Sequence, residues 1–530
     1  MTARTFTPWS TRVMNLAHFP EQQARRLPDR PAFAWGSRVW SWSEFDARVK
    51  AMAAALAAEA GIGKGDRVLV QSQNCNQLFE SFFACLRLGA IWVPANYRGA
   101  PEDLRWMAEL SGAKALLCNA AFPEHAGIEV PGMTARLAIG PAGFGPDIEE
   151  LMTRHADTVP PLAPVDRDDP AWFFFTSGTT GRPKASVLTH GQLGFVINNH
   201  LCDLVPGLTP DDASLVVAPL SHGAGMHAIL MAARGAPTIL PEAPRFDTAE
   251  VWSLVERWRV TNIFTVPTIL KLMVEAPQVH EVDHSSLRYV IYAGAPMYRT
   301  DQVRALETLG PVLVQYFGLG EVTGAITVLP PADHSATDDT RAGSCGYART
   351  GMQVEIQGED GAPLAAGETG EICVTGPAVF AGYWDNPEAN AKSFRDGWFR
   401  TGDLGHMDAN GYVYITGRAS DMFISGGSNI YPREIEEKIL QHDAVSEVAV
   451  FGMPDPKWGE IGVAVCALNP GATLDHAELE AFLRPRLASY KLPRQVHVWD
   501  ALPKTGYGKL SKRVIRSELE ARLAAGEGVE

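Results

Sequence analysis

Residues 171–184, AWFFFTSGTTGRPK, join an apolar run to a loop rich in glycine, hydroxyl and basic residues. The five residues 171–175 predict a buried strand, because short apolar runs bounded by glycines are typical of strands in a sheet core. Glycines in the loop let backbone N–H groups converge on one point, while hydroxyls and cations add further donors. The loop is therefore predicted to bind phosphate oxygens through Thr176, Ser177, Gly178, Thr179, Thr180, Gly181, Arg182 and Lys184.

A flexible surface turn is the alternative for this loop, but a plain turn does not need so many donors close together. The spacing excludes the standard P-loop, because only two residues separate Gly178 from Gly181 and Lys184 follows a proline. The loop instead resembles the phosphate-loop signature of the adenylate-forming superfamily, which contains acyl- and aryl-CoA synthetases, luciferases and peptide-synthetase adenylation domains. This resemblance implies that the loop contacts ATP and that Thr180 takes part in catalysis.

Length and composition limit the class of protein. A chain of 530 residues is too long for one simple core, so two or more domains are expected. The net charge of −15 disfavours a nucleic-acid partner. Seven cysteines without C-x-x-C spacing indicate reduced thiols in a cytoplasmic protein. The sequence shows neither the apolar region of a signal peptide nor a long apolar segment, so no membrane span is expected.

The order of predicted elements divides the chain into three parts. Strands and helices alternate up to about residue 330, as in parallel α/β layers, and Ser43 and Asp46 have the spacing of a capping box for one helix that ends at Gly61. Glycine-dense alternating runs then predict a small antiparallel β unit over about 340–417, followed by a compact α+β unit. The resembled family has this α/β layout: a large N-terminal domain (1–418) of two stacked α/β subdomains plus a small β-barrel, and a small mobile α+β C-terminal domain (419–530).

Residues 315–321, QYFGLGE, follow a predicted strand, so Glu321 is expected at the edge where open α/β sheets bind ligands. Tyr316 or Phe317 could stack on a flat base, and Glu321 could hold Mg²⁺ beside phosphates. A solvated loop acid is the alternative for Glu321, but the nearby phosphate loop disfavours it. The family pattern here is Tyr-Gly-x-Thr-Glu, which assigns Gly318 to the nucleotide and acid sites. Gly320 stands where the family has a threonine that touches the α-phosphate.

Thr401, Gly402 and Asp403 form the next candidate group, with Arg418 fifteen residues after the aspartate. A buried carboxylate can accept hydrogen bonds from both ribose hydroxyls, and a nearby arginine can hold it in place. In isolation a tight turn with a structural ion pair is the better explanation. The resemblance of WFRTGDLG and ITGRASD to family motifs implies that Asp403 and Arg418 bind the ribose of AMP.

Two further stretches follow predicted strands and are candidates for the acid site. His222 lies in PLSHGAGMH and resembles the family residue that lines the passage to the carboxylate, although a lone histidine there is usually structural. The stretch YAGAPM offers small residues that leave space for an acyl chain, and close strand packing explains them equally well. The resemblance assigns Tyr292, Ala293 and Gly294 to the acid pocket, and Gly294, Ala295 and Pro296 to the adenine.

The C-terminal part carries the remaining candidates, and the resemblance alone singles them out. Lys509 in PKTGYGKLSKR resembles the catalytic lysine, whose charge suits the α-phosphate during transfer. Ser420 stands at the family hinge, where large backbone changes occur. The residues that resemble the coenzyme A site are Ser425, Gly426, Gly427, Trp458 and Tyr490. An ordinary, partly exposed tryptophan is an equally good account of Trp458.

Taken together, the resemblance implies an ATP-dependent carboxylic acid–CoA ligase that uses Mg²⁺ and coenzyme A and forms an acyl-adenylate. Ala293 and Gly294 favour a medium-to-long aliphatic acid. An aryl or cinnamic acid, a carrier-protein acceptor and a homologue without turnover stay open as alternatives. A homodimer also stays open.

Overall fold

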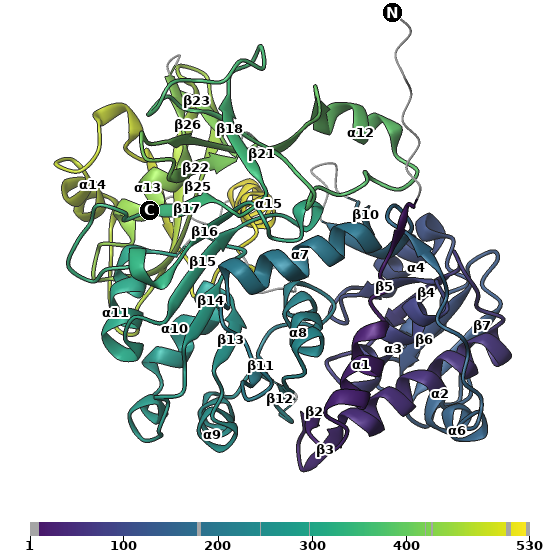
Figure 1. Ribbon diagram of the computed structural model, residues 1–530. Helices are drawn as coiled ribbons and strands as arrows, with labels where there is room; N and C mark the ends of the chain where they lie inside the picture. Colours follow the sequence, from purple (N-terminus) through teal and green to yellow (C-terminus); the bar gives the residue numbers. More distant parts are fainter. Residues whose placement is uncertain are drawn as a thin grey trace, which may run out of the picture.

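A computed structural model describes residues 10–176, 182–243, 245–295, 297–418, 420–425, 428–504 and 510–525. It confirms the predicted α/β class, with a large N-terminal domain and a smaller C-terminal one (Figure 1). Within these ranges, the helices are too short or too polar to cross a bilayer.

The first sheet has six strands: β4 (Arg67–Gln71), β5 (Ile91–Ala95), β6 (Ala115–Asn119), β7 (Ala135–Ile139), β9 (Pro170–Thr176) and β10 (Lys184–Thr189). Their order is β10–β9–β5–β4–β6–β7, and all neighbours pair in parallel except β9 with β10. The predicted strand 171–175 is confirmed as the middle of β9. A short ladder of β1 (Arg12–Val13) with β8 (Val165–Asp166) lies outside this sheet.

The second sheet is larger and begins with β2 (Pro31–Trp35), β3 (Arg38–Ser41), β11 (Ser214–Val216), β12 (Thr238–Leu240), β13 (Asn262–Thr265), β14 (Tyr289–Tyr292), β15 (Leu313–Phe317) and β16 (Thr327–Leu329). Strands β2 and β11–β15 pair in parallel, whereas β16 is antiparallel to β15. The N-terminal hairpin β2–β3 thus completes a sheet whose other strands come more than 170 residues later.

The β-rich segment continues this second sheet through shared hydrogen bonds. It contains β17 (Ser344–Ala348), β18 (Gln353–Gln357), β19 (Gly370–Thr375), β20 (Phe394–Arg395), β21 (Trp398–Met407) and β22 (Val413–Arg418). Strand β17 pairs with β16 on one side and with β22 on the other, both antiparallel. The predicted antiparallel pairing is therefore present, and it is anchored on the edge of the α/β layer.

Helices fill the space between the two sheets and cover their outer faces. One core cluster contains residues of both sheets together with α1 (His18–Arg26), α2 (Trp42–Ala60), α3 (Asn76–Arg87), α6 (Ile148–Arg154), α7 (His190–Asp203) and α8 (Gly223–Arg234). Figure 1 shows α7 and α8 between β13–β15 and β4–β6. The outer faces carry α4 (Pro101–Ser111) and α5 (Pro123–Ala126) on one side and α9 (Thr248–Trp258), α10 (Pro267–Glu275) and α11 (Arg299–Leu309) on the other. Helix α12 (Pro387–Ser393) belongs to the β-rich segment.

The start of α2 corrects the predicted capping box. The Ser41 hydroxyl accepts from the Glu44 backbone N–H, and the Glu44 carboxylate accepts from the Ser41 N–H. The box therefore lies two residues before Ser43 and Asp46, because the longer glutamate side chain reaches back to the cap. Gly61 ends the helix in a left-handed conformation, as predicted.

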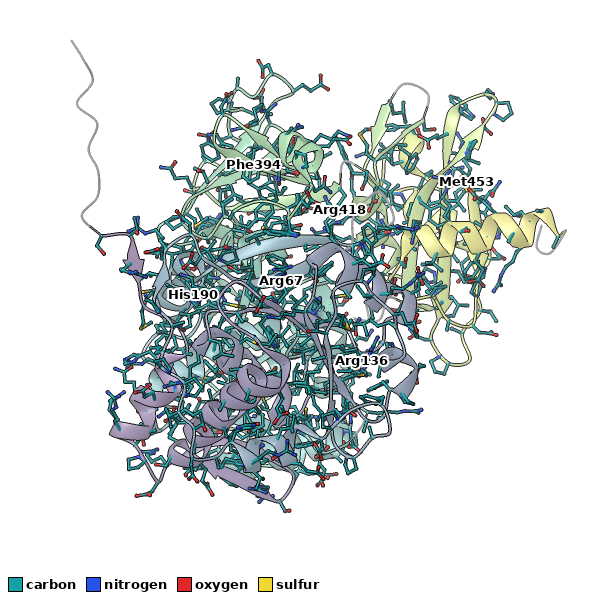
Figure 2. All side chains as sticks on the ribbon, turned by 90° about the vertical axis from the view of Figure 1, so that its right-hand side faces the viewer. Arg67, Arg136, His190, Phe394, Arg418 and Met453 are labelled. Atoms are coloured by element: carbon teal, nitrogen blue, oxygen red, sulfur yellow. The ribbon has the colours of Figure 1, made fainter. Side chains whose placement is uncertain are left out.

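The smaller domain contains β23 (Phe423–Ser425), β24 (Ser428–Ile430), β25 (Val445–Asp455), β26 (Gly459–Leu468), β27 (Gln495–Val498), α13 (Pro432–Ile439), α14 (His476–Leu483) and α15 (Lys512–Ala524). Its five strands form a separate sheet with core clusters on both faces. Figure 2 places Arg418 where the two domains meet and Met453 within the smaller one.

We expect Gly346 to be essential for the antiparallel pairing of β16 with β17. A Cβ at this position would lie 1.9 Å from the Val328 carbonyl oxygen, and its φ is +91°. Gly346→Ala should therefore lower the thermal midpoint strongly, with a cost of about 2–4 kcal/mol. The matched control is Gly343→Ala, where φ is +77° but no atom lies within 4 Å. That control should cost only about 1 kcal/mol of backbone strain. Equal losses in both variants, measured by calorimetry, would contradict the close approach.

Candidate active site

A buried carboxylate lies where β9 and β15 end. Glu321 follows β15 in a short 3₁₀ turn and is 6% exposed. Its Oε1 accepts hydrogen bonds from the Thr176 hydroxyl and from the Tyr383 hydroxyl, both at 2.9 Å. No described residue donates a hydrogen bond to Oε2. One carboxylate oxygen is thus fixed while the other stays available, which fits magnesium's preference for one or two carboxylates with phosphate oxygens.

Tyr383 was missed by the sequence analysis. The segment around it pairs with β10, where Val187 exchanges backbone hydrogen bonds with Ala381 and Gly382. Burial first, and then the adjacent Glu321 carboxylate, raise the pKa of Tyr383, so its hydroxyl stays a donor. Its position results from pairing between segments almost 200 residues apart, for which the local pattern AGYW gave no signal.

Lys184 lies above the ring of Tyr383, with Nζ 4.0 Å from the ring centroid. Burial lowers its pKa, and the charge of Glu321 opposes this effect. Lys184 is also the cross-strand partner of Thr176, so the predicted phosphate loop joins two adjacent strands. The candidates Ser177, Gly178, Thr179, Thr180 and Gly181 lie outside the described residues and stay predictions.

The glycine at 320 has a steric explanation. A Cβ on Gly320 would lie 2.6 Å from the Phe174 ring and 2.8 Å from Cγ2 of Thr176. The Phe174 ring also meets His222 edge to face, with centroids 4.9 Å apart. The ring of Phe174 therefore occupies the space that the family threonine would need.

Asp403 and Arg418 face each other across β21 and β22, as their cross-strand register requires. Oδ1 of Asp403 accepts from Nε of Arg418 at 3.1 Å, whereas buried Oδ2 has no partner among the described residues. Burial raises the pKa of Asp403, and Arg418 opposes this shift. A buried acceptor without a donor fits a ribose hydroxyl. Thr401 supports the turn by donating to the Ile372 carbonyl and accepting from the Asp403 N–H.

The acid-site candidates converge at the edge of the second sheet, and Asn74, in the loop that follows β4 of the first sheet, holds one of them in place. The Asn74 amide donates to the Ala218 carbonyl and accepts from the Leu220 N–H, which fixes the turn before His222. His222 precedes α8 and lies within 3.3 Å of the Ser221 hydroxyl. Just after β14 come buried Ala293, Gly294 with φ +83°, and Ala295, while Pro296 lies outside the described residues.

Two tyrosines do not lie where the sequence analysis placed them. Tyr292 is fully buried in the core on the α11 face, and its hydroxyl bonds with Gln315, Gln302 and His334. It therefore does not line the acid pocket, because the alternation of β14 turns Tyr292 and Ala293 to opposite faces. Tyr316 is also buried, among rings below α8, so it cannot stack on a base.

Its neighbour Phe317 points to the other face of β15 and is half-buried, which leaves it as the candidate for base stacking. Gly318 faces Gly324, and a Cβ there would lie 2.3 Å from the Gly324 Cα. This close approach, rather than ligand contact, is sufficient to explain Gly318.

Part of the proposed coenzyme A surface is brought together in the smaller domain. Ser425 pairs with Gly459, the residue after Trp458. Trp458 is 39% exposed, and Lys457 and Arg494 lie 4.9 and 5.6 Å from its ring centroid. Tyr490 is exposed beside Lys491 and makes no described contact with Trp458.

The other candidates of this region cannot be placed in the same way. Gly426, Gly427 and Lys509 lie outside the described residues. Ser420 is exposed and hydrogen-bonds to the Asp421 carboxylate. Its assignment as the hinge stays a prediction.

Gly320 and Phe174 should behave as a coupled pair. Gly320→Ala is expected to lower AMP formation at least tenfold, because the new methyl displaces Phe174 and Thr176 and so disturbs Glu321. Phe174→Val in the same chain should restore most of the loss, since it removes the ring atoms in conflict. Initial rates of AMP release for the two single variants and the double variant measure this coupling. Additive losses would show that the ring is not the cause.

Asp403→Asn separates nucleotide binding from stability. We expect ATP affinity to fall about tenfold, because the amide is a weaker acceptor for ribose hydroxyls than a carboxylate. Thermal stability at pH 7 should stay equal or rise, because a raised pKa means that the ionised side chain destabilises the fold.

This destabilisation is fully present above the raised pKa and disappears as the pH falls below the ordinary value of 3.8. The difference in thermal midpoint should therefore shrink on acidification. A variant that is less stable at pH 7 but binds ATP normally would show that the pair is only structural. Calorimetry between pH 4 and 8 and ATP titration decide this.

The chain is similar to known proteins over both of its domains. Residues 20–384 match the model of the AMP-binding enzyme family, and residues 434–509 match the AMP-binding enzyme C-terminal domain. Feruloyl-CoA synthase of Amycolatopsis sp is 40% identical over 95% of this chain and 99% of its own length. The long-chain-fatty-acid–CoA ligase FadD13 of Mycobacterium tuberculosis is 34% identical over 87% of this chain and 90% of its own.

Among solved structures, o-succinylbenzoate CoA synthetase of Bacillus subtilis, in complex with its acyl-adenylate intermediate, is similar over almost the whole chain. The TM-score is 0.82 at 31% identity, with 95% of this chain and 97% of that chain covered. Both domains of the present chain are included in these matches. The chain therefore belongs to the AMP-binding enzyme family of adenylate-forming enzymes, within which its relatives are acid–CoA ligases.

Proposed function

We propose that this acid–CoA ligase activates an aryl-substituted acid of the cinnamic type, using ATP and Mg²⁺, and transfers the acyl group to coenzyme A. The observation that carries the adenylation step is the buried Glu321 carboxylate, held on one oxygen beside Lys184. The relatives that act on feruloyl and o-succinylbenzoyl groups support the aryl class.

In the first half-reaction, a carboxylate oxygen of the acid attacks the α-phosphorus of ATP, and the bond to the bridging oxygen breaks to release pyrophosphate. Lys184 supplies positive charge for the phosphates, and Lys509 would neutralise the transition state at the α-phosphate. The free oxygen of Glu321 would hold Mg²⁺, which when bound offsets charge on the phosphates. Asp403 and Arg418 would keep the ribose fixed while the bonds exchange.

In the second half-reaction, the thiol sulfur of coenzyme A attacks the acyl carbonyl, and the C–O bond to AMP breaks. The smaller domain would turn about Ser420 so that Lys509 leaves and Gly426 and Gly427 line the passage. Trp458, with Lys457 and Arg494 beside it, is suited to an adenine ring that carries phosphates. This pairing of an aromatic face with two cations favours coenzyme A over a carrier protein as acceptor.

The choice of acid rests on the side chains around the candidate passage. Phe174 contacts His222 edge to face, and the ring of Phe264 packs against Gly223. Flat aromatic faces suit a planar ring and its conjugated side chain. The medium-to-long aliphatic acid that Ala293 and Gly294 favoured is the second candidate, supported by the fatty-acid ligase among the relatives.

AMP release tests the proposal with ATP, Mg²⁺ and acids in matched groups: ferulate, 4-hydroxycinnamate, cinnamate, benzoate, decanoate and palmitate. We expect kcat/KM to be highest for a cinnamate and at least tenfold higher than for either fatty acid, with turnover that requires coenzyme A. Higher kcat/KM for decanoate or palmitate would favour the aliphatic candidate. Pyrophosphate exchange without coenzyme A turnover would indicate another acceptor, and ATP binding without AMP would indicate a homologue without turnover.

A further inference from the structure

A hollow of about 410 Å³ lies between the β2–β3 hairpin and the helices α2, α3 and α6. Figure 1 shows β3, α2 and α6 at the lower end of the molecule, whereas β10 and β21, which carry residues of the candidate active site, lie toward its upper end. The lining residues are not among the active-site candidates. We call this feature the hairpin hollow, and the side chains that line it include Trp35, Arg38, Trp40, Arg48, Gln77 and Glu149.

One wall of the hairpin hollow is the face of the hairpin that carries two indole rings. Arg38 is the cross-strand partner of Trp35, and Trp40 comes two residues later, so the three side chains lie on the same face. The guanidinium carbon of Arg38 lies 4.9 Å from the centroid of the Trp40 ring. Arg38 is exposed and makes no ion pair with any residue that the structure describes. The wall therefore offers flat apolar faces beside an unpaired cation.

The other wall contains an arginine held between two carboxylates. Arg48 donates to both oxygens of Glu80 and to both oxygens of Glu149. The Glu80 side chain is fully buried, whereas that of Glu149 is 37% exposed. Within the described ranges, Oε2 of Glu149 accepts only the bond from Arg48, so it can accept another. With Arg38 included, the two positive and two negative charges of these walls cancel.

Two buried polar atoms of the lining have no hydrogen-bond partner in the described part of the chain. They are Nε1 of Trp40, which can only donate, and Oε1 of Gln77, which can only accept. Trp40 is only 4% exposed, and the Gln77 amide nitrogen is already bound to Glu149 at 2.7 Å. Buried polar atoms without partners cost free energy, so we infer that another molecule supplies an acceptor to Trp40 and a donor to Gln77.

We propose that the hairpin hollow binds an aromatic amino acid in its zwitterionic form. The carboxylate would accept hydrogen bonds from Arg38 and from the Trp40 N–H, and the ammonium group would donate to Gln77 and Glu149. The ring of the ligand would pack against the indole of Trp35. A zwitterion has no net charge, which suits walls whose own charges cancel, whereas a polyanion such as a nucleotide would be repelled by Glu149. This second site goes beyond the proposed function and does not depend on it.

Ordered water is the competing account for the hairpin hollow, since buried waters commonly satisfy such atoms. The two accounts differ in what they predict for ligands. A hollow that only holds water would not distinguish the zwitterion from analogues that lack one of its groups. A binding site would lose affinity when either charged group or the ring is removed, because its own polar atoms are then left unpaired.

Titration calorimetry of the full chain with L-phenylalanine tests the proposal. Three analogues each lack one feature: 3-phenylpropanoate lacks the ammonium group, 2-phenylethylamine lacks the carboxylate, and glycine lacks the ring. Each analogue is measured by its displacement of L-phenylalanine, so that an acid bound only at the acid site does not contribute. We expect L-phenylalanine to bind at least tenfold more tightly than any of the analogues.

Two variants locate the bound amino acid. Arg38→Gln removes the unpaired cation from an exposed position, and Trp40→Phe removes the N–H but keeps an aromatic ring. Each should weaken the binding of L-phenylalanine at least tenfold. The matched control is Arg257→Gln, since Arg257 is exposed in the last turn of α9 and does not line the hairpin hollow. The control should bind L-phenylalanine as the natural protein does.

Three results would overturn the proposal. The first is no binding of L-phenylalanine up to about 10 mM. The second is equal affinity for L-phenylalanine and an analogue, which would show that the charges or the ring are not recognised. The third is unchanged affinity in both Arg38→Gln and Trp40→Phe, which would place the ligand elsewhere. Because Arg38 is exposed, its variant keeps the test valid even if Trp40→Phe lowers the yield of folded protein.

Discussion

The candidate active site depends on the Glu321 carboxylate, which two hydroxyl donors hold inside the protein. Glu321 belongs to the turn after β15, Thr176 ends β9 of the other sheet, and Tyr383 lies in the segment that pairs with β10. The two hydrogen bonds therefore connect three segments that are far apart in the chain. Because a buried charge is costly without such partners, correct docking of the two sheets and a correctly oriented carboxylate require each other.

Local sequence patterns were sufficient to predict those helices and strands whose boundaries depend on only a few neighbouring residues. The phenylalanine run gave β9, and Gly61 gave the end of α2. The direction in which a side chain points was harder to predict, because a shift of one residue along a strand moves a side chain to the opposite face of the sheet. Resemblance assigned Tyr292 to the acid pocket, and Tyr316 was a candidate for base stacking, yet both side chains are buried in cores.

Contacts between segments that are distant in the sequence could not be predicted from local patterns. Tyr383 reaches Glu321 only through pairing with β10, and Asn74 fixes the turn before His222 from the loop after β4. The Asp403–Arg418 pair was predictable because the two residues share one antiparallel ladder. Gly320 was read as a missing hydroxyl, and only the position of the Phe174 ring shows why a side chain has no room there.

Strand β17 pairs with β16 and with β22, so one continuous ladder runs from β15, next to Glu321, to Asp403 on β21. The backbone hydrogen bonds of this ladder fix the distances between its strands. The ladder ends at Arg418, before the smaller domain begins. The separation between Glu321 and Asp403, the two proposed nucleotide contacts, is therefore set by the spacing of these strands. A rotation of the smaller domain would change which of its residues approach the nucleotide. It would leave the strands that carry Asp403 and precede Glu321 unchanged.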